Sequence, residues 1–195
     1  MRFFLCFLIA QFTVVAFAEV PLRADALKLP DGRTKMCMLP NGVLVQELTV
    51  PGPVGGFAGF TTVTPAGAST TWNLAQLNNL ANMAVVLAGS TFHTSDPQVL
   101  LRAQTLVIEQ LAFHECAHAR LPTANEFAAN AESIEQMQAL GEITPADLQW
   151  IGTFTQSLGP QPPQYGGSGA AFWAGTIQLM NASPGPHATL DSRPI

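Results

Sequence analysis

Apolar and polar positions between residues 20 and 70 follow the pattern of β-strands separated by turns. Apolar runs at 35–39 and 43–50 flank the tripeptide Pro-Asn-Gly at 40–42. Asn-Gly between two such runs favours a hairpin, because both residues tolerate positive φ. A further strand is predicted at 57–64, where the following proline and glycine end it.

The pattern changes to helical spacing from about residue 71. The first predicted helix ends at Gly89, and the second begins at Asp96-Pro97 and runs to about Leu121. This second helix is apolar on most faces, so we expect it to be central and buried. Three more helices are predicted, at 123–140, from Thr144 to about Leu158, and at 170–180, with a loop rich in Pro and Gly at 159–169.

Strands followed by helices predict an α+β fold, with an N-terminal β-hairpin or small antiparallel sheet and then a helical bundle. Of the 195 residues, 48% are hydrophobic and 11% are charged, which excludes a disordered chain. The formal net charge is -5 and no run of Lys or Arg is present, so the composition argues against nucleic acid as a partner.

The first eighteen residues have the features of a secretory signal peptide. Arg2 precedes an apolar run, and Ala-Phe-Ala at 16–18 is a cleavage pattern that places the start of the mature chain at Glu19. An uncleaved anchor is the alternative. The prediction is a secreted or periplasmic protein whose single domain spans 19–195, with no stable membrane anchor after cleavage.

Two cysteines, Cys37 and Cys116, remain in that domain. An even pair in an exported protein favours one disulfide, and two free buried thiols are the alternative. Cys116 projects about 200° around its predicted helix from His114, so a disulfide there would face away from the histidines.

The sequence His114-Glu115-Cys116-Ala117-His118 is an HExxH motif within the predicted central helix. Histidines four residues apart project from one helical face, so both rings can bind one metal ion. Glu115 lies at the side of that face, where it can deprotonate a metal-bound water. Zn²⁺ suits such a site, and a helix that simply buries two histidines is the alternative.

A third ligand is needed, and Glu126 is the best candidate. It follows His118 by eight residues, across a tight connection that we expect to place two helices antiparallel. The alternative is a capping box at 123–126, in which Glu126 serves only its own helix. Asn130, four residues later, is predicted to hydrogen-bond a ring nitrogen of a ligating histidine.

These residues resemble the zincin metallopeptidases of the gluzincin type, in which HExxH is followed by NExxxD on the next helix; here the second element reads Asn-Glu-Phe-Ala-Ala-Asn at 125–130. There is a looser similarity to small exported bacterial HExxH proteins. The resemblance implies a zincin-like fold, Zn²⁺ held by His114, His118 and Glu126, Glu115 as the general base, and Asn130 in the place of the orienting aspartate.

Gluzincins stabilise the oxyanion with a histidine or tyrosine, and the chain has one tyrosine, Tyr165, in a glycine-rich loop. An ordinary half-buried loop residue is the alternative. We therefore expect an exported zinc-dependent hydrolase that cleaves a peptide or protein substrate. The competing hypothesis is an exported binding or structural protein that keeps the zincin scaffold and cleaves nothing.

Overall fold

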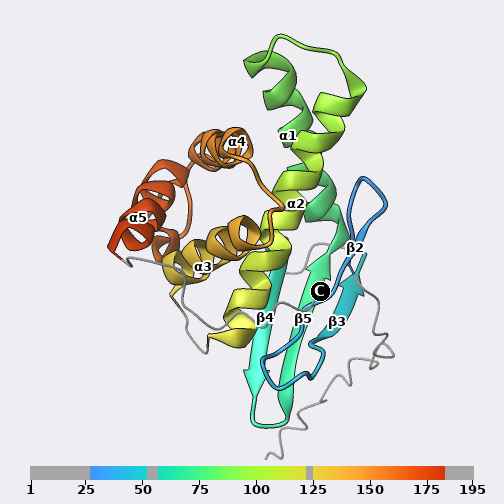
Figure 1. The fold of residues 1–195 in the computed structure, drawn as a ribbon, viewed down its shortest axis with the longest axis vertical. Helices are drawn as coiled ribbons and strands as arrows, with labels where there is room; N and C mark the ends of the chain where they lie inside the picture. The colour runs from blue at the N-terminus through green and yellow to red at the C-terminus, as the bar shows by residue number, and fades with distance from the viewer. Residues whose placement is uncertain (1–26, 52–56, 122–124, 183–195) are drawn as a thin grey trace, which may run out of the picture.

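The computed structural model describes residues 27–51, 57–121 and 125–182 of the chain. In this part of the chain the strands come first and five helices follow, so the predicted α+β class is confirmed (Figure 1). The expected signal peptide at 1–18 and the cleavage point before Glu19 lie outside the described residues. Within the described ranges, none of the helices combines the length and apolarity needed to span a bilayer.

The strands form two small sheets. The first contains β1 (Leu27–Lys28) and β2 (Thr34–Lys35), which pair antiparallel. The second contains β3 (Gln46–Val50), β4 (Gly59–Thr64) and β5 (Gly67–Asn73) in the order β3-β5-β4. Strand β4 is antiparallel to β5, whereas β3 joins the other edge of β5 in parallel. The central strand is therefore the last one in sequence, just before the first helix.

The turn at 40–42 forms as predicted, but the hairpin around it is short. Met38 and Leu44 make an antiparallel bridge, and the Val45 N–H donates to Cys37 O. After Val45 the chain separates from the segment around Cys37 and pairs with β5 instead. The strand expected at 43–50 therefore begins only at Gln46, as β3. The strand expected at 57–64 is confirmed as β4.

Strand β5 was not anticipated by the sequence reasoning. Its buried residues Ala68, Thr70 and Trp72 alternate with more exposed positions, and Asn73 at its end is buried as well. Because three of its seven residues are threonine or serine at its centre, the strand carries little of the apolar alternation that marks a half-buried strand. Burial therefore alternates along most of β5, whereas apolar and polar residue types alternate only weakly.

Five helices follow the sheet. Their bounds are α1 (Leu74–Thr91), α2 (Pro97–Arg120), α3 (Glu126–Ala139), α4 (Pro145–Ser157) and α5 (Gly169–Ala182). Asp96 caps α2 and Thr144 caps α4, where Thr144 and Asp147 form a capping box. Gly141, at φ 69°, ends α3 as expected. Gly89 does not end α1, which continues to Thr91.

Helix α2 is the central element, as its sequence predicted. It contacts α1, α3 and α4 and packs on β4 and β5 (Figure 1). The largest apolar cluster joins its buried residues to those of α1, α3 and α4. A disulfide between Cys37 and Cys116 links α2 to the segment that leads into β3, which confirms the expected bond.

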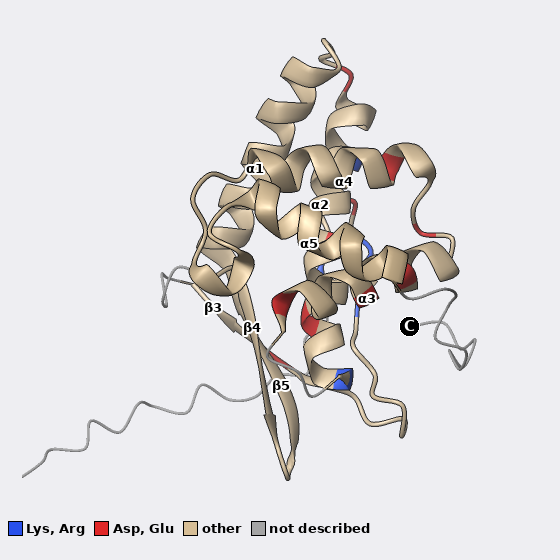
Figure 2. Ribbon diagram, turned by 90° about the vertical axis from the view of Figure 1, so that its left-hand side faces the viewer, with Lys and Arg blue, Asp and Glu red and all other residues tan. Residues whose placement is uncertain are grey.

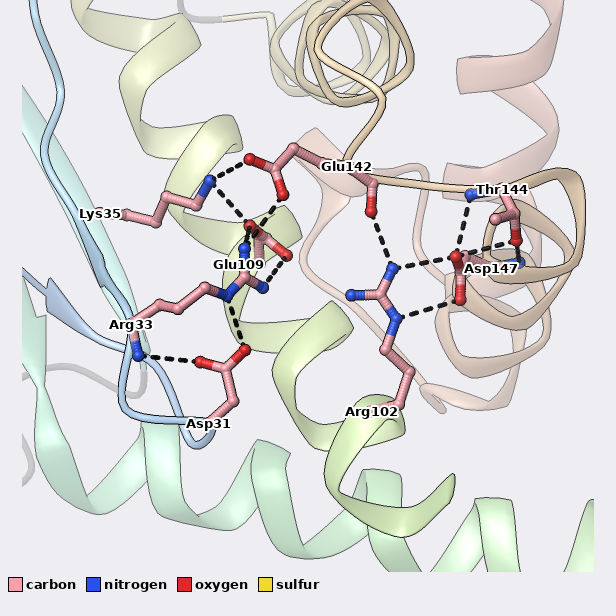
Figure 3. Close-up of polar contacts among 8 residues, drawn as sticks. All are labelled: Asp31, Arg33, Lys35, Arg102, Glu109, Glu142, Thr144 and Asp147. Carbon is pink, nitrogen blue, oxygen red and sulfur yellow. Dashed lines mark hydrogen bonds and ion pairs between the residues drawn. The ribbon is translucent and has the colours of Figure 1, made fainter. Parts of the chain in front are cut away.

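Buried charge on α2 is neutralised by Lys35 on β2 and by Arg33 in the turn before it (Figure 3). The Glu109 side chain is fully buried, with Lys35 Nζ at 2.9 Å and Arg33 Nη2 at 3.2 Å. Both cations also reach Glu142, which follows α3, at 2.8 Å and 3.0 Å. Because an unpaired buried carboxylate is strongly destabilising, this network holds β2 and the α3–α4 connection against α2.

A second pair joins α2 to the start of α4. Arg102 Nη2 lies 2.9 Å from Asp147 Oδ2 and donates to the Glu142 backbone oxygen at 2.8 Å. Burial alone raises the pKa of Asp147, but hydrogen bonds from Arg102 and Thr144 lower it further, so the net shift is downward. Asp147 is therefore charged at neutral pH and stabilises the fold through this contact.

We predict that Arg102→Gln is less stable than wild type by about 0.5–1 kcal/mol at pH 6, the range of a partly exposed ion pair. Because the folded-state pKa of Asp147 is depressed, the contribution is complete above its unfolded-state value near 4 and is lost as the pH falls through the folded-state value. Urea denaturation between pH 6 and pH 3 should show the two stability curves converging on acidification. Curves that stay parallel would contradict the role of this pair.

Candidate metal centre

The two histidines of HExxH share one face of α2. Their Nε2 atoms lie 3.2 Å apart, and their ring centroids are separated by 4.8 Å. Both side chains are largely buried, with exposed fractions of 7% for His114 and 13% for His118. One helical turn therefore presents two nitrogen donors to a common point, as the spacing predicted.

Glu126 completes the group from the first position of α3. Its Oε2 lies 3.1 Å from Nε2 of His114 and 3.1 Å from Nε2 of His118. Burial alone raises the pKa of Glu126, but hydrogen bonds and charge from the two imidazoles lower it to about 2. Glu126 is therefore a carboxylate at neutral pH, the form that binds a metal.

Asn125, rather than Glu126, caps α3. The Asn125 side chain accepts a hydrogen bond from the Ala128 N–H, which leaves the Glu126 carboxylate to the histidines. The alternative capping box at 123–126 is therefore not what places Glu126, and Thr123 lies outside the described residues. The expected antiparallel packing was wrong, since α3 crosses α2 obliquely (Figures 1 and 2). The first position of α3 still brings Glu126 to both histidines.

The spacing of the three donor atoms suits a tetrahedral ion. His114, His118 and Glu126 are the one group of this kind among the described residues, with ligand atoms within 4.8 Å of one another. Bonds of 2.0–2.1 Å to a tetrahedral centre separate neighbouring ligands by about 3.3 Å. The observed separations of 3.1–3.2 Å are close to that value, so the residues fit such an ion with little rearrangement.

Glu115 is held beside this group by strand β4. The residue is 5% exposed, and Thr61 Oγ1 lies 2.9 Å from its Oε2 and 3.1 Å from its backbone oxygen. Burial raises the pKa of Glu115, while the neighbouring His114 and the Thr61 hydrogen bond oppose that shift. A carboxyl group with a raised pKa and a fixed orientation is suited to accept and return a proton.

The close approach of β4 to α2 depends on Gly59. A Cβ at this position would lie 3.2 Å from Glu115 Cγ and 2.5 Å from the Trp72 ring. A side chain at 59 would therefore displace the strand that carries Thr61. Neither Gly59 nor Thr61 was singled out from the sequence, because nothing local marks a residue whose role depends on a contact 54 positions away.

Asn130 does not contact the histidine rings in the way that the sequence predicted. It is 2% exposed, it accepts a hydrogen bond from Gln110 Nε2, and its Nδ2 donates to Thr176 Oγ1 at 2.9 Å. The oblique crossing of α3 explains the difference, because it brings the Asn130 amide to Gln110, one helical turn before His114 on α2, and to Thr176 on α5. Asn130 therefore fixes α3 between α2 and α5 and positions Glu126 indirectly.

Tyr165 lies at the site, on a cavity of about 460 Å³ that His114 and Glu115 also line. It ends the short helix η1 (Pro163–Tyr165), and its ring packs on Phe172 at 5.2 Å. Burial raises the pKa of Tyr165, and the negative charges of Glu126 and Glu115 and a hydrogen bond to Glu126 raise it further. The phenol is therefore a protonated hydrogen-bond donor throughout the neutral range.

No protein-family model, curated protein or solved structure matches this chain. The chemistry of the site is therefore inferred from its own geometry. That geometry brings Glu115, Tyr165 and the three predicted ligands to one place. Asn130, by contrast, has partners other than the histidine rings.

We predict that the purified protein binds one Zn²⁺ per chain and that His114→Ala loses it, because two donors cannot hold the ion as tightly as three. Elemental analysis after dialysis against a weak chelator measures the content. His93→Ala is the matched control, because His93 lies in the loop between α1 and α2 and outside the group. Equal zinc in wild type and His114→Ala would contradict the assignment.

Proposed function

We propose that this protein is a zinc-dependent metallopeptidase of the gluzincin type. One observation carries the proposal: His114 Nε2, His118 Nε2 and Glu126 Oε2 converge within hydrogen-bond distance of one another, and Glu115 lies beside them. Two imidazoles and one carboxylate are a common donor set of catalytic zinc sites, which leave a position for water or substrate. The separation of the donors supports Zn²⁺ as the cofactor.

When bound, zinc lowers the pKa of a coordinated water and polarises a carbonyl oxygen. The remaining work falls to residues of this chain. Glu115 accepts a proton from the attacking water and later transfers it to the leaving amine. Thr61 supports this role, because its hydrogen bond at 2.9 Å holds one carboxylate oxygen and leaves the other for the water.

Tyr165 supplies the donor for the developing oxyanion in this proposal. Its hydroxyl remains protonated at neutral pH because burial and two carboxylates oppose its ionisation. Packing on Phe172 and the turn at Gly166, at φ 75°, limit how far the ring can move. A fixed donor aimed at the reacting carbonyl is the usual source of oxyanion stabilisation.

Two features of the site favour a peptide substrate. Strand β4 is at the edge of the sheet, and the residues that lead into it, Phe57 and Ala58, line the cavity beside Glu115. An extended peptide can add to such an edge through main-chain hydrogen bonds. The cavity itself is lined mainly by apolar side chains, such as Leu111 and Phe172, that suit a large apolar residue of the substrate.

The proposed place of action is outside the cytoplasm, in the periplasm or the external medium. The Cys37–Cys116 disulfide supports this, because disulfides persist in oxidising compartments. The signal-peptide pattern at 1–18 points to the same conclusion. Peptides or proteins in that compartment are the proposed substrates.

We predict that Glu115→Gln retains its zinc and loses at least about a thousandfold in kcat, because the amide cannot accept the proton. Digestion of a peptide library, read by mass spectrometry, measures the cleavage. Glu132→Gln, the same change on α3 outside the metal group, should cleave as wild type does.

A chelator control is required, and cleavage that persists after zinc removal would contradict the proposal. Wild-type protein that holds zinc yet cleaves no library would support the non-catalytic scaffold instead. Glu115→Gln with full activity would exclude Glu115 as the base and would require another residue in that role.

We also predict that Tyr165→Phe lowers kcat by about a hundredfold and changes KM little, as expected for the loss of one oxyanion donor. The phenyl ring keeps the contact with Phe172, so the fold should be unaffected. Steady-state kinetics on a peptide identified from the library provide the measurement. A change confined to KM would assign Tyr165 to substrate binding only.

A further inference from the structure

A row of polar side chains crosses the sheet beneath α2. Glu47 on β3 is directly opposite Thr70 on β5, and Thr70 is directly opposite Thr61 on β4. Residues in register on neighbouring strands share one face of a sheet. Here that face is the one packed on α2, since Thr61 contacts Glu115 and the Glu47 and Thr70 residues are 6% and 1% exposed.

The first half of the row is hydrogen-bonded. Thr61 Oγ1 lies 2.8 Å from Thr70 Oγ1 and 2.9 Å from Glu115 Oε2. Each hydroxyl carries a single proton, so a proton donated by Thr61 to Glu115 leaves Thr61 to accept from Thr70. The row therefore continues from the proposed general base to the centre of the sheet.

The second half of the row ends in a buried acid. Glu47 Oε2 is buried and has no hydrogen-bond partner among the described residues. Glu47 and Thr70 both line a cavity of about 20 Å³, which is large enough for one water molecule. A buried carboxyl oxygen without a partner is costly, which favours a water molecule or a proton at Oε2 of Glu47.

The surroundings of Glu47 favour its neutral form. Burial raises the pKa of Glu47 to about 7, although the backbone N–H of Leu27 and the indole N–H of Trp72 oppose this shift. Lys35 is the one cation that lines the small cavity, and its Nζ is already paired with Glu109 and Glu142. The other lining groups from β5 and α2, such as Trp72 and Phe113, carry no charge.

We propose that Glu47 is a positioning residue for Glu115, acting along the row Thr70–Thr61 through one water molecule in the small cavity. A neutral Glu47 donates toward Thr70, so that Thr70 donates to Thr61 and the Thr61 proton is directed to Glu115 Oε2. An ionised Glu47 accepts instead and turns the Thr70 proton away, which lets Thr61 donate to Thr70 and release Glu115. This inference rests on the proposed role of Glu115.

The first test uses the metal-free chain and needs no enzymatic activity. The ¹³Cβ chemical shift of Thr61, followed by NMR over pH 5–9, reports the orientation of its hydroxyl. We expect a step at the titration midpoint of Glu47, which its own carboxyl ¹³C resonance gives. The step should disappear in Glu47→Gln and in Thr70→Val.

Thr71→Val is the matched control, because Thr71 lies on the opposite face of the same strand and should leave the step in place. A Thr61 shift that does not respond to Glu47, or a step that survives Thr70→Val, would overturn the inference. Where Thr70→Val does not fold by circular dichroism, Glu47→Gln provides the decisive comparison.

The second test measures kinetics in the zinc-loaded protein. Thr70→Val should lower kcat about fivefold without changing KM, because a Thr61 hydroxyl that no longer accepts from Thr70 can turn its proton from Glu115 Oε2 to the Glu115 backbone oxygen. Thr70→Ser should restore kcat. Glu47→Gln, which stays neutral and can donate, should keep kcat and remove its decline as the pH rises through the Glu47 midpoint. If the wild-type protein turns over substrate and Thr70→Val has the same kcat, the inference about Glu47 is wrong and the proposed function stands. Wild-type protein without turnover would overturn the proposed function, and the Thr61 shift would then decide the inference.

Discussion

The structure depends on how α2 accommodates ionisable groups inside a hydrophobic core. This helix carries Glu109, His114 and Glu115 into positions that are almost inaccessible to water. Each needs a partner from another element, because a buried charge or polar group left alone is destabilising by several kcal/mol. The elements around α2 are therefore placed as much by polar pairing as by apolar contact. Lys35 on β2 and Arg33 in the turn before it supply this pairing for Glu109.

The same constraint connects the proposed catalytic groups to the rest of the fold. Glu126 reaches the histidines because α3 begins where α2 ends, and α3 is fixed by the contacts of Asn130 with its neighbours. Thr61 reaches Glu115 because Gly59 lets β4 lie against α2. The site is thus formed by residues from α2, α3 and β4, and a small number of close contacts holds α3 and β4 against α2.

Local patterns in the sequence account for the parts of this arrangement that lie within one element. The spacing of His114 and His118 on one helix, the caps of α2 and α4 and the end of α3 at Gly141 follow from residues a few positions apart. The pairing of β3 with β5 and the partners of Asn130 do not, because they depend on how separate elements cross. The central strand β5 has too few apolar residues for its position to be predicted from the sequence pattern. The direction of α3 cannot be predicted from the length of the connection between α2 and α3.

The disulfide makes the residue next to Glu115 a fixed point shared by two distant parts of the chain. Cys37 precedes β3, the strand that bears Glu47, while Cys116 follows the proposed base directly. Both ends of the polar row beneath α2 are therefore anchored through one covalent bond, although 79 positions separate the two cysteines. Reduction of this bond would therefore remove the covalent link between the segment that leads to Glu47 and the helix that bears Glu115.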